Sequence, residues 1–147
     1  MTKDVALIPG GGAAGGVGAG LIAFCDARLE KGIEIILDMI KVDDYLKGVD
    51  LVITGEGQID GQSVYGKTPV GIANHAAKYN IPTIAIAGSL GEGIEEIYRH
   101  NIDSAMTIVN GPMSLADAKE QVIELMETAT ERTIRLLNVG IKMECQI

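Results

Sequence analysis

The chain has 147 residues, 47% of them apolar and 22% charged, which is enough for one domain with a buried core. Twenty acidic residues against twelve basic ones give a formal net charge of −8, which argues against a nucleic acid partner. Aromatic residues make up only 3%, which disfavours base-stacking surfaces. Cys25 and Cys145 fit neither a disulfide framework nor a metal motif, which favours a reducing cytoplasm.

The first 28 residues combine an apolar stretch with a dense cluster of glycines. Residues 5–25 carry no charge, but seven glycines and Pro9 make a membrane helix or an export signal unfavourable. Within this stretch the pattern predicts a strand over residues 4–8 and a helix over residues 13–28. We therefore expect no membrane segment here.

From residue 32 onward, short apolar runs alternate with longer amphipathic segments, as is typical of a parallel sheet covered by helices. The expected strands are residues 49–54, 82–87 and 105–109, and the expected helices are residues 32–46, 69–79, 92–100 and 114–137. The last helix is the best marked, because Ser114 is a suitable N-cap and Asp117 follows three residues later. Gly55, Gly88 and Gly111 follow the strands, at the edge where open α/β sheets bind ligands.

The segment PGGGAAGG allows two functional interpretations. Gly10, Gly12 and Gly15 match the G-x-G-x-x-G spacing of dinucleotide-binding folds, and Asp38 lies about twenty residues further on. That interpretation requires a strand over residues 32–37, where the apolar positions follow helical spacing instead. Glycines before a helix also let an anion approach the backbone closely. Close packing of a helix on a sheet is the structural alternative.

The segment TGEGQIDGQSVYGKTP raises the question of a phosphate site. Residues 61–68 match the P-loop spacing G-x-x-x-x-G-K-[ST], but GEGQID separates them from the strand and Pro69 follows them. The residue types nevertheless suit phosphoryl transfer. Lys67 can neutralise phosphate charge, while Glu56 and Asp60 can hold magnesium or take a proton from a substrate hydroxyl. A turn built from glycine and aspartate is the structural alternative.

Five stretches together resemble glycerate kinases of the bacterial type I family. They are PGGGAAGGVGAGL at 9–21, GIEIILD at 32–38, DLVITGEGQIDGQSVYGKTPVGIA at 50–73, IPTIAIAGSL at 81–90 and GPMSLADA at 111–118. The resemblance covers nearly the whole chain, and the run from 54 to 69 is the most specific to the family. It implies transfer of the γ-phosphoryl group of ATP, with Mg²⁺, to D-glycerate in the cytoplasm. The product, 2- or 3-phosphoglycerate, stays open.

The resemblance also implies a set of site residues. Glu56, Asp60 and Lys67 are the expected catalytic residues, with Glu56 and Asp60 as magnesium ligands and the division of roles left open. Contacts to substrate or ATP are expected from Gly10, Gly11, Gly12, Gly15, Gly16, Gly55, Gly57, Ser63 and Gly66. The family usually carries arginine where Gln58 stands and often threonine where Ser63 stands. Without that arginine, binding of phosphate or carboxylate is expected to be weaker.

The implied fold is α/β, with three layers and a mainly parallel sheet between helices, as the flavodoxin-like or Rossmann-like half of a two-domain kinase. We assign residues 1–48 to the second domain or the cleft between domains, and residues 49–147 to a partial flavodoxin-like domain. The chain corresponds to the carboxyl-terminal portion of the family's length, and motifs like DSFKGS and DGGEGT are absent from it. We therefore expect self-association or pairing with the amino-terminal portion through an uncovered sheet edge or apolar face.

Three hypotheses follow. The chain is part of a glycerate kinase that needs the amino-terminal portion, a non-catalytic module that binds a nucleotide or another anion, or a dinucleotide-binding oxidoreductase domain. A strand over residues 32–46 would favour the third hypothesis, and convergence of the expected catalytic residues would favour the first. His75 and His100 are expected on solvated helix surfaces, outside the site.

Overall fold

The computed structural model describes residues 4–5 and 7–144, and its centre is a parallel sheet of three strands. The strands are β1 (Val52–Ile59), β2 (Thr83–Leu90) and β3 (Ser104–Thr107), in the order β1-β2-β3. Val52 pairs with Thr83, and Ile84 pairs with Ser104. Because the strands are parallel, the loops after them gather at one edge of the sheet.

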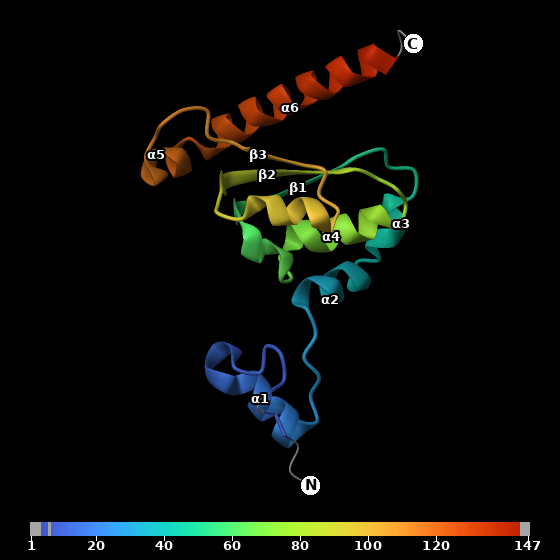
Figure 1. Ribbon diagram of the computed structural model, residues 1–147, viewed down its shortest axis with the longest axis vertical. Helices are drawn as coiled ribbons and strands as arrows, with labels where there is room; N and C mark the ends of the chain where they lie inside the picture. The colour runs from blue at the N-terminus through green and yellow to red at the C-terminus, as the bar shows by residue number, and fades with distance from the viewer. Residues whose placement is uncertain (1–3, 6, 145–147) are drawn as a thin grey trace.

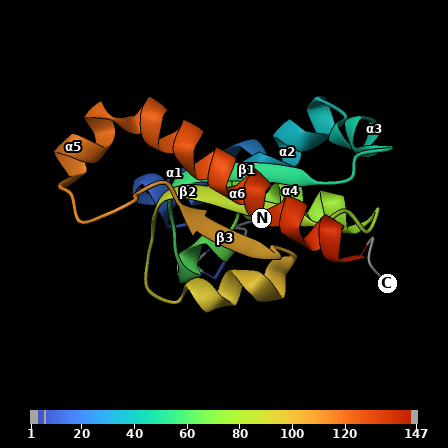
Figure 2. The same ribbon diagram turned by 90° about the horizontal axis from the view of Figure 1, so that it is seen from above.

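Helices lie on both faces of this sheet, which confirms the expected three-layer α/β fold (Figures 1 and 2). One face carries α2 (Gly32–Met39), α3 (Val42–Leu46), α4 (Thr68–Ala77) and the 3₁₀ helices η1 (Gly61–Val64) and η2 (Ile94–His100). The other face carries α6 (Val122–Glu144), preceded by the short helix α5 (Leu115–Glu120). None of the helices in the described residues is both long and apolar enough to cross a membrane.

Three apolar clusters join these layers. The first joins α2 and α3 to α4 and β1 and contains Ile33, Leu37, Val42, Leu46, Val52, Ala76 and Ile81. The second joins α4 and η2 to the sheet and contains Ile59, Val70, Ala73, Ala85, Ala87, Ile97 and Ile102. The third joins α6 to the segment after β3 and contains Ile108, Leu125 and Ala129. Burial of these side chains supplies the main favourable free energy of folding.

A buried histidine also ties α4 to α2 and α3. The His75 side chain is only 5% exposed; its Nδ1 lies 2.7 Å from Asp43 Oδ1 and its Nε2 lies 3.3 Å from Glu34 Oε2. Lys78 Nζ lies 3.6 Å from Asp43 Oδ2. The hydrogen bond with His75 lowers the pKa of the Asp43 carboxyl, against the opposing effect of burial. The expectation of a solvated His75 is therefore wrong, because α2 and α3 pack over this position.

Several expected elements differ from the structure. β1 runs to Ile59 instead of ending at residue 54, so Gly55 lies within this strand and the strand continues almost to residue 61. Gly88 likewise lies within β2 and not in the loop after it. Within the expected strand at residues 4–8, the described positions form no strand, and the amide of Gly11 donates instead to Ile8 O in a turn. The expected helix at 32–46 is divided where Lys41 takes a left-handed φ of 54°. The expected helix at 114–137 is divided at Gln121, where no glycine or proline marks the break. The Ser114–Asp117 capping box at its start is confirmed.

The glycine-rich segment forms a turn and a kinked helix, α1 (Ala13–Cys25), that lies apart from the sheet in Figure 1. The kink falls where Ala14, Gly15 and Gly16 all have positive φ, at 52°, 69° and 87°. A connection of residues 26–31 leads from α1 to α2. The assignment of residues 1–48 to another domain stays a prediction; α2 and α3 share a core with α4 and β1.

The contact between α2 and α4 depends on Gly71. A Cβ at this position would lie 2.5 Å from Ile33 Cγ1, so we expect Gly71→Ala to overpack the interface and to lower the free energy of unfolding by about 1–3 kcal/mol. Gly140→Ala in α6 is the matched control, because a Cβ there would meet no atom within 4 Å. That change should be neutral or stabilising by up to about 1 kcal/mol. Urea denaturation measures both; equal effects would contradict the packing argument.

Candidate functional site

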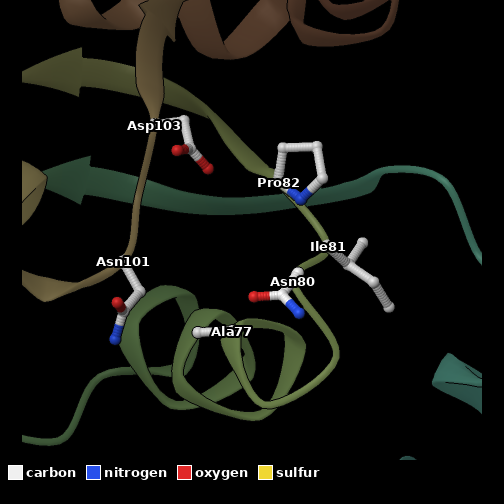
Figure 3. A pocket seen from close by; sticks show the side chains of 6 residues that line it. All are labelled: Ala77, Asn80, Ile81, Pro82, Asn101 and Asp103. Atoms are coloured by element: carbon white, nitrogen blue, oxygen red, sulfur yellow. The ribbon is translucent and has the colours of Figure 1, made fainter.

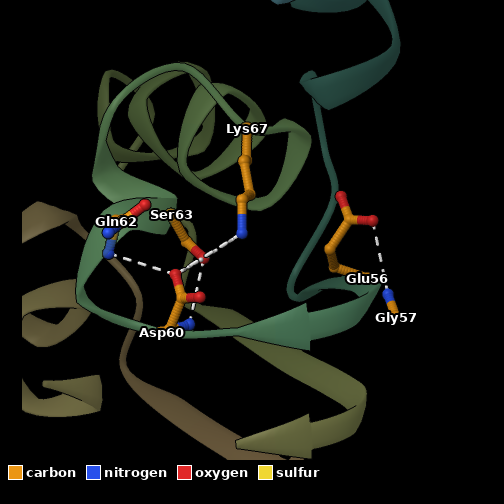
Figure 4. Close-up of polar contacts among 6 residues, drawn as sticks. All are labelled: Glu56, Gly57, Asp60, Gln62, Ser63 and Lys67. Carbon is orange, nitrogen blue, oxygen red and sulfur yellow. Dashed lines mark hydrogen bonds and ion pairs between the residues drawn. The ribbon is translucent and has the colours of Figure 1, made fainter. Parts of the chain in front are cut away.

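Three polar side chains meet in the loop between β1 and α4 (Figure 4). Asp60 is the N-cap of η1, and its Oδ1 accepts hydrogen bonds from Gln62 N at 3.1 Å and from Ser63 Oγ at 3.0 Å. Lys67 Nζ lies 3.1 Å from Ser63 Oγ and 3.4 Å from Asp60 Oδ1. The side chains of Asp60 and Lys67 are 24% and 38% exposed, whereas Ser63 is fully buried. We call these three residues the Asp60–Ser63–Lys67 cluster.

This cluster keeps the Asp60 carboxylate ionised. The Ser63 hydrogen bond is the largest cause that holds the pKa of the Asp60 carboxyl below its ordinary value of 3.8, while burial opposes it. The charge and hydrogen bond of Lys67 and the amide of Gln62 lower the same pKa further. Asp60 is therefore a fixed negative charge near neutral pH, suited to a cation and poorly suited to accepting a proton.

The surroundings of Lys67 suit an anionic ligand. Lys67 is the N-cap of α4, so its side chain starts from the helix end where the dipole is positive, and its ammonium reaches Ser63 and Asp60. The preceding Gly66 has a φ of 98°, a conformation that favours glycine. A Cβ at Gly66 would lie 3.8 Å from Cγ and Cδ of Lys31, so the stem of a second lysine passes beside the loop. The sequence analysis did not single out Lys31.

The loop after β2 supports the cluster and adds a carboxylate. The amide of Gly61 donates to Glu92 O at 3.0 Å, and the amide of Gly91 donates to Ile59 O at 2.7 Å. An open cavity of about 340 Å³ lies between the two loops, lined by Gln58, Asp60, Gly61, Gln62, Glu92 and Gly93. The sequence analysis missed Glu92, although the glycine-bearing loop after β2 was the signal that could have found it.

Glu56 does not join the cluster. Its side chain is exposed and its Oε1 accepts from the amide of the adjacent Gly57 at 3.3 Å, while Figure 4 shows it on the far side of the loop from Asp60 and Lys67. Gly55 in the same strand has a packing role, because a Cβ there would lie 2.8 Å from Ile86 O. The structure thus brings together two of the three expected catalytic residues, and the roles of all three stay predictions.

The fit to magnesium rests on Asp60. No group of three or more histidine, cysteine or acidic side chains in the described residues forms a ready-made metal site. Magnesium in proteins is usually held by one or two carboxylates together with substrate phosphates and water. Asp60 Oδ1 is occupied by three donors, which leaves Oδ2 as the ligand atom, and Glu92 lines the same cavity. This donor set fits a magnesium ion that arrives with phosphate, and Glu56 as a ligand stays a prediction.

The other expected ligand contacts lie in α1 and the turn before it. Gly10, Gly11, Gly12, Gly15 and Gly16 form the turn and the kink at the start of this helix, in a segment that lies apart from the Asp60–Ser63–Lys67 cluster in Figure 1. Their role as an anion cradle stays a prediction. The dinucleotide-binding interpretation is wrong in its required strand, because residues 32–39 form α2.

Two other cavities bear on the choice of site. The cavity in Figure 3, of about 350 Å³, lies at the amino ends of β2 and β3, and Asp103 Oδ2 in its wall accepts from the amide of Thr83 at 2.7 Å. This carboxylate stabilises the start of β2, at the edge opposite to where α/β sheets bind ligands. A mainly apolar cavity of about 380 Å³ lies at the carboxyl edge, lined by Ile108, Val109, Met113 and Lys119 among others.

Fold and site together define an α/β protein with a paired lysine and aspartate in a loop at the carboxyl ends of its strands, and comparison with known proteins specifies the family. The model of the glycerate kinase family matches residues 1–138. Glycerate kinase of Halalkalibacterium halodurans is 54% identical over 129 residues, which cover 88% of this chain and 34% of the relative. Glycerate 2-kinase of Escherichia coli is 40% identical over 139 residues, covering 95% of this chain and 36% of the relative.

A solved structure supports the same family. A protein of Salmonella typhimurium LT2 assigned as glycerate kinase 2 superposes with a TM-score of 0.61 and is 41% identical, covering 94% of this chain and 34% of that chain. The chain therefore belongs to the glycerate kinase family. It spans about a third of the length of the relatives it matches.

The ion pair between Asp60 and Lys67 predicts how the stability of the fold depends on pH. Folding lowers the pKa of the Asp60 carboxyl, so the ionised carboxylate stabilises the fold at pH values above the ordinary aspartate pKa. This stabilisation is lost as the pH falls through the lowered pKa. Lys67→Met removes the positive charge, so we expect the pKa of Asp60 to rise and the loss to begin at higher pH. Lys47→Met is the control, because Lys47 pairs with Asp44 instead. Carboxyl ¹³C NMR of Asp60 measures the shift; equal titrations in both variants would contradict the pairing.

Proposed function

We propose that the chain provides the phosphate-handling part of a cytoplasmic glycerate kinase, which transfers the γ-phosphoryl group of ATP to D-glycerate with Mg²⁺. The observation that carries this proposal is the ion pair between Asp60 and Lys67, the N-cap residue of α4. Family membership selects the reaction among the many that such a loop could serve. The mainly apolar cavity at the same edge has the size and lining to accept a purine ring.

The cluster assigns roles within this reaction. Lys67 neutralises charge on the transferred phosphoryl group, which is the main contribution a protein makes to phosphoryl transfer. Asp60 stays ionised and holds the cation, for which its lowered pKa suits it. Magnesium supplies further charge neutralisation on the phosphates when it is bound. The exposed carboxylates of Glu56 and Glu92 are then the groups left to accept the proton of the glycerate hydroxyl.

A non-catalytic module that binds a nucleotide or another anion is the second candidate. One observation favours it: Glu56 lies apart from the cluster. Such a module would keep the cation and the helix N-terminus for binding without completing the reaction. Binding of Mg–ATP without any phosphoglycerate product would distinguish it from the kinase.

The order of the strands suggests where the family's amino-terminal portion would bind. Among the described residues β1 pairs only with β2, so the backbone groups along the other side of β1 are unpaired. The side chain of Ile53 in this strand is 44% exposed, and apolar side chains also line the outer surface of α6, including Ile123, Met126 and Ile141. An added strand at β1 would satisfy the edge and cover Ile53. Self-association at the same edge is the alternative outcome.

The kinase proposal is tested by assaying this chain with ATP, Mg²⁺ and D-glycerate, alone and with the amino-terminal portion of the Halalkalibacterium halodurans relative. We expect phosphoglycerate when both portions are present. Lys67→Ala should lower kcat by about 10²–10³-fold, because it removes a charge aimed at the transition state. Lys47→Ala is the matched control, since this exposed lysine pairs with Asp44. Absence of product from the combined portions, with ATP still bound, would favour the non-catalytic module.

The partner proposal predicts a defect in assembly. Ile53→Lys places a charge on the uncovered face of β1, so we expect it to weaken association with the amino-terminal portion by at least tenfold in sizing chromatography and calorimetric titration. Tyr98→Lys in η2 is the control, because Tyr98 is similarly exposed at 47%. Both variants should keep the circular dichroism of the parent. Equal association by the two variants would exclude β1 as the interface.

A further inference from the structure

We infer that Ser63 is a positioning residue, which acts on the reaction by fixing the Lys67 ammonium and the Asp60 carboxylate rather than by contacting a ligand. This inference rests on the proposed function of the same loop. It gives Ser63 a different role from the direct ligand contact expected from the sequence, and that expectation stays a prediction. Three properties of Ser63 support this role: its hydroxyl makes all the hydrogen bonds it can, its side chain is buried, and η1 holds it in place.

The hydrogen-bonding capacity of Ser63 is fully used inside the protein. A serine hydroxyl has one donor and two acceptor sites. Ser63 Oγ donates to Asp60 Oδ1 at 3.0 Å, and it accepts from the amide of Asp60 at 3.0 Å and from Lys67 Nζ at 3.1 Å. The residue is also 0% exposed. A ligand could therefore reach Ser63 only by displacing one of these bonds.

Lys67, in contrast, keeps capacity for a ligand. An ammonium has three donors, of which one is directed at Ser63 Oγ and one at Asp60 Oδ1. The lysine side chain is 38% exposed, so its remaining donor can reach an anion. At a distance of 3.4 Å and with both side chains partly exposed, the pair with Asp60 alone would hold this flexible side chain weakly. The Ser63 hydroxyl supplies the second point that fixes its direction.

The fold holds Ser63 in turn. Its hydroxyl and the Asp60 carboxylate form a reciprocal capping box at the start of η1. The adjacent Val64 packs against the apolar cluster that contains Ile59 and Val70. The amide of Gly61 is bound to Glu92 O in the next loop. The hydroxyl is thus placed by the core of the domain, and it transmits that placement to the two charged groups.

The first test needs no activity. We compare Ser63→Ala and Ser63→Thr by NMR, following the Asp60 carboxyl ¹³C and the Lys67 amine ¹⁵N signals. In Ser63→Ala the Asp60 carboxyl signal should shift at constant pH and the amine signal should show fast averaging, because the shared hydroxyl is gone. Ser63→Thr keeps a hydroxyl and should restore both signals. If Ser63→Ala does not fold, Ser63→Cys, of similar size and a weaker donor, takes its place. Unchanged signals in the folded variant would overturn the inference.

The second test uses the kinase assay with both portions present. Ser63→Ala should lower kcat by about 10–100-fold with the KM values for ATP and glycerate nearly unchanged, and Ser63→Thr should recover most of it. The double variant Ser63→Ala/Lys67→Ala should lose clearly less than the product of the two single losses, because part of the effect of Ser63 passes through Lys67. Additive losses, or a rise in KM alone, would indicate direct ligand contact and contradict the inference.

The two tests separate the inference from the proposed function. If no phosphoglycerate forms with any variant while the NMR signals respond as expected, the reaction assignment fails and the positioning of Lys67 and Asp60 stands. If phosphoglycerate forms and Ser63→Ala changes neither kcat nor the NMR signals, the reaction assignment stands and the positioning role fails.

Discussion

The packing of α4 on β1 and β2 is the interaction on which the rest of the structure depends. The buried face of α4 includes the small residues Gly71, Ala73 and Ala76, so the helix can approach both the sheet and α2 closely. Its first turn presents Lys67 beside η1, and its last turn carries His75 between Asp43 and Glu34. One helix thus fixes Lys67 of the Asp60–Ser63–Lys67 cluster and also holds α2 and α3 in place.

The fold could be predicted where local pattern and tertiary need agree. The apolar run at residues 82–87 and the capping box at Ser114 specify their elements locally, and the structure follows them. The run at residues 49–54 predicts the presence of β1 but not its extent, because the strand continues through polar residues and glycines to Ile59. The strand expected at residues 4–8 is not present in the described positions, where the amide of Ile8 donates to Val5 O in place of a neighbouring strand. The burial of His75 was also beyond the local pattern, since its two carboxylate partners lie 32 and 41 residues away in sequence.

The candidate site was predictable in its residue types but not in its geometry. Asp60, Ser63 and Lys67 share one loop, so their sequence spacing nearly determines that they meet. Glu56 precedes them on an extended strand, which carries its side chain away from the loop, and no local pattern reveals this direction. Glu92 reaches the site only because β1 and β2 are neighbours. Residues joined by sheet topology are those that a single sequence specifies least.

The connection between α1 and α2 limits the distance between the glycine-rich segment and the loop that carries the Asp60–Ser63–Lys67 cluster. Residues 26–31 are six in number, and a fully extended chain gains at most about 3.6 Å per residue, so the tether spans roughly 20 Å. Its last residue, Lys31, rests against Gly66. The end of α1 therefore stays within about 20 Å of that loop. The length of this linker, and not the concentration of the protein in solution, sets the effective concentration of α1 at the loop.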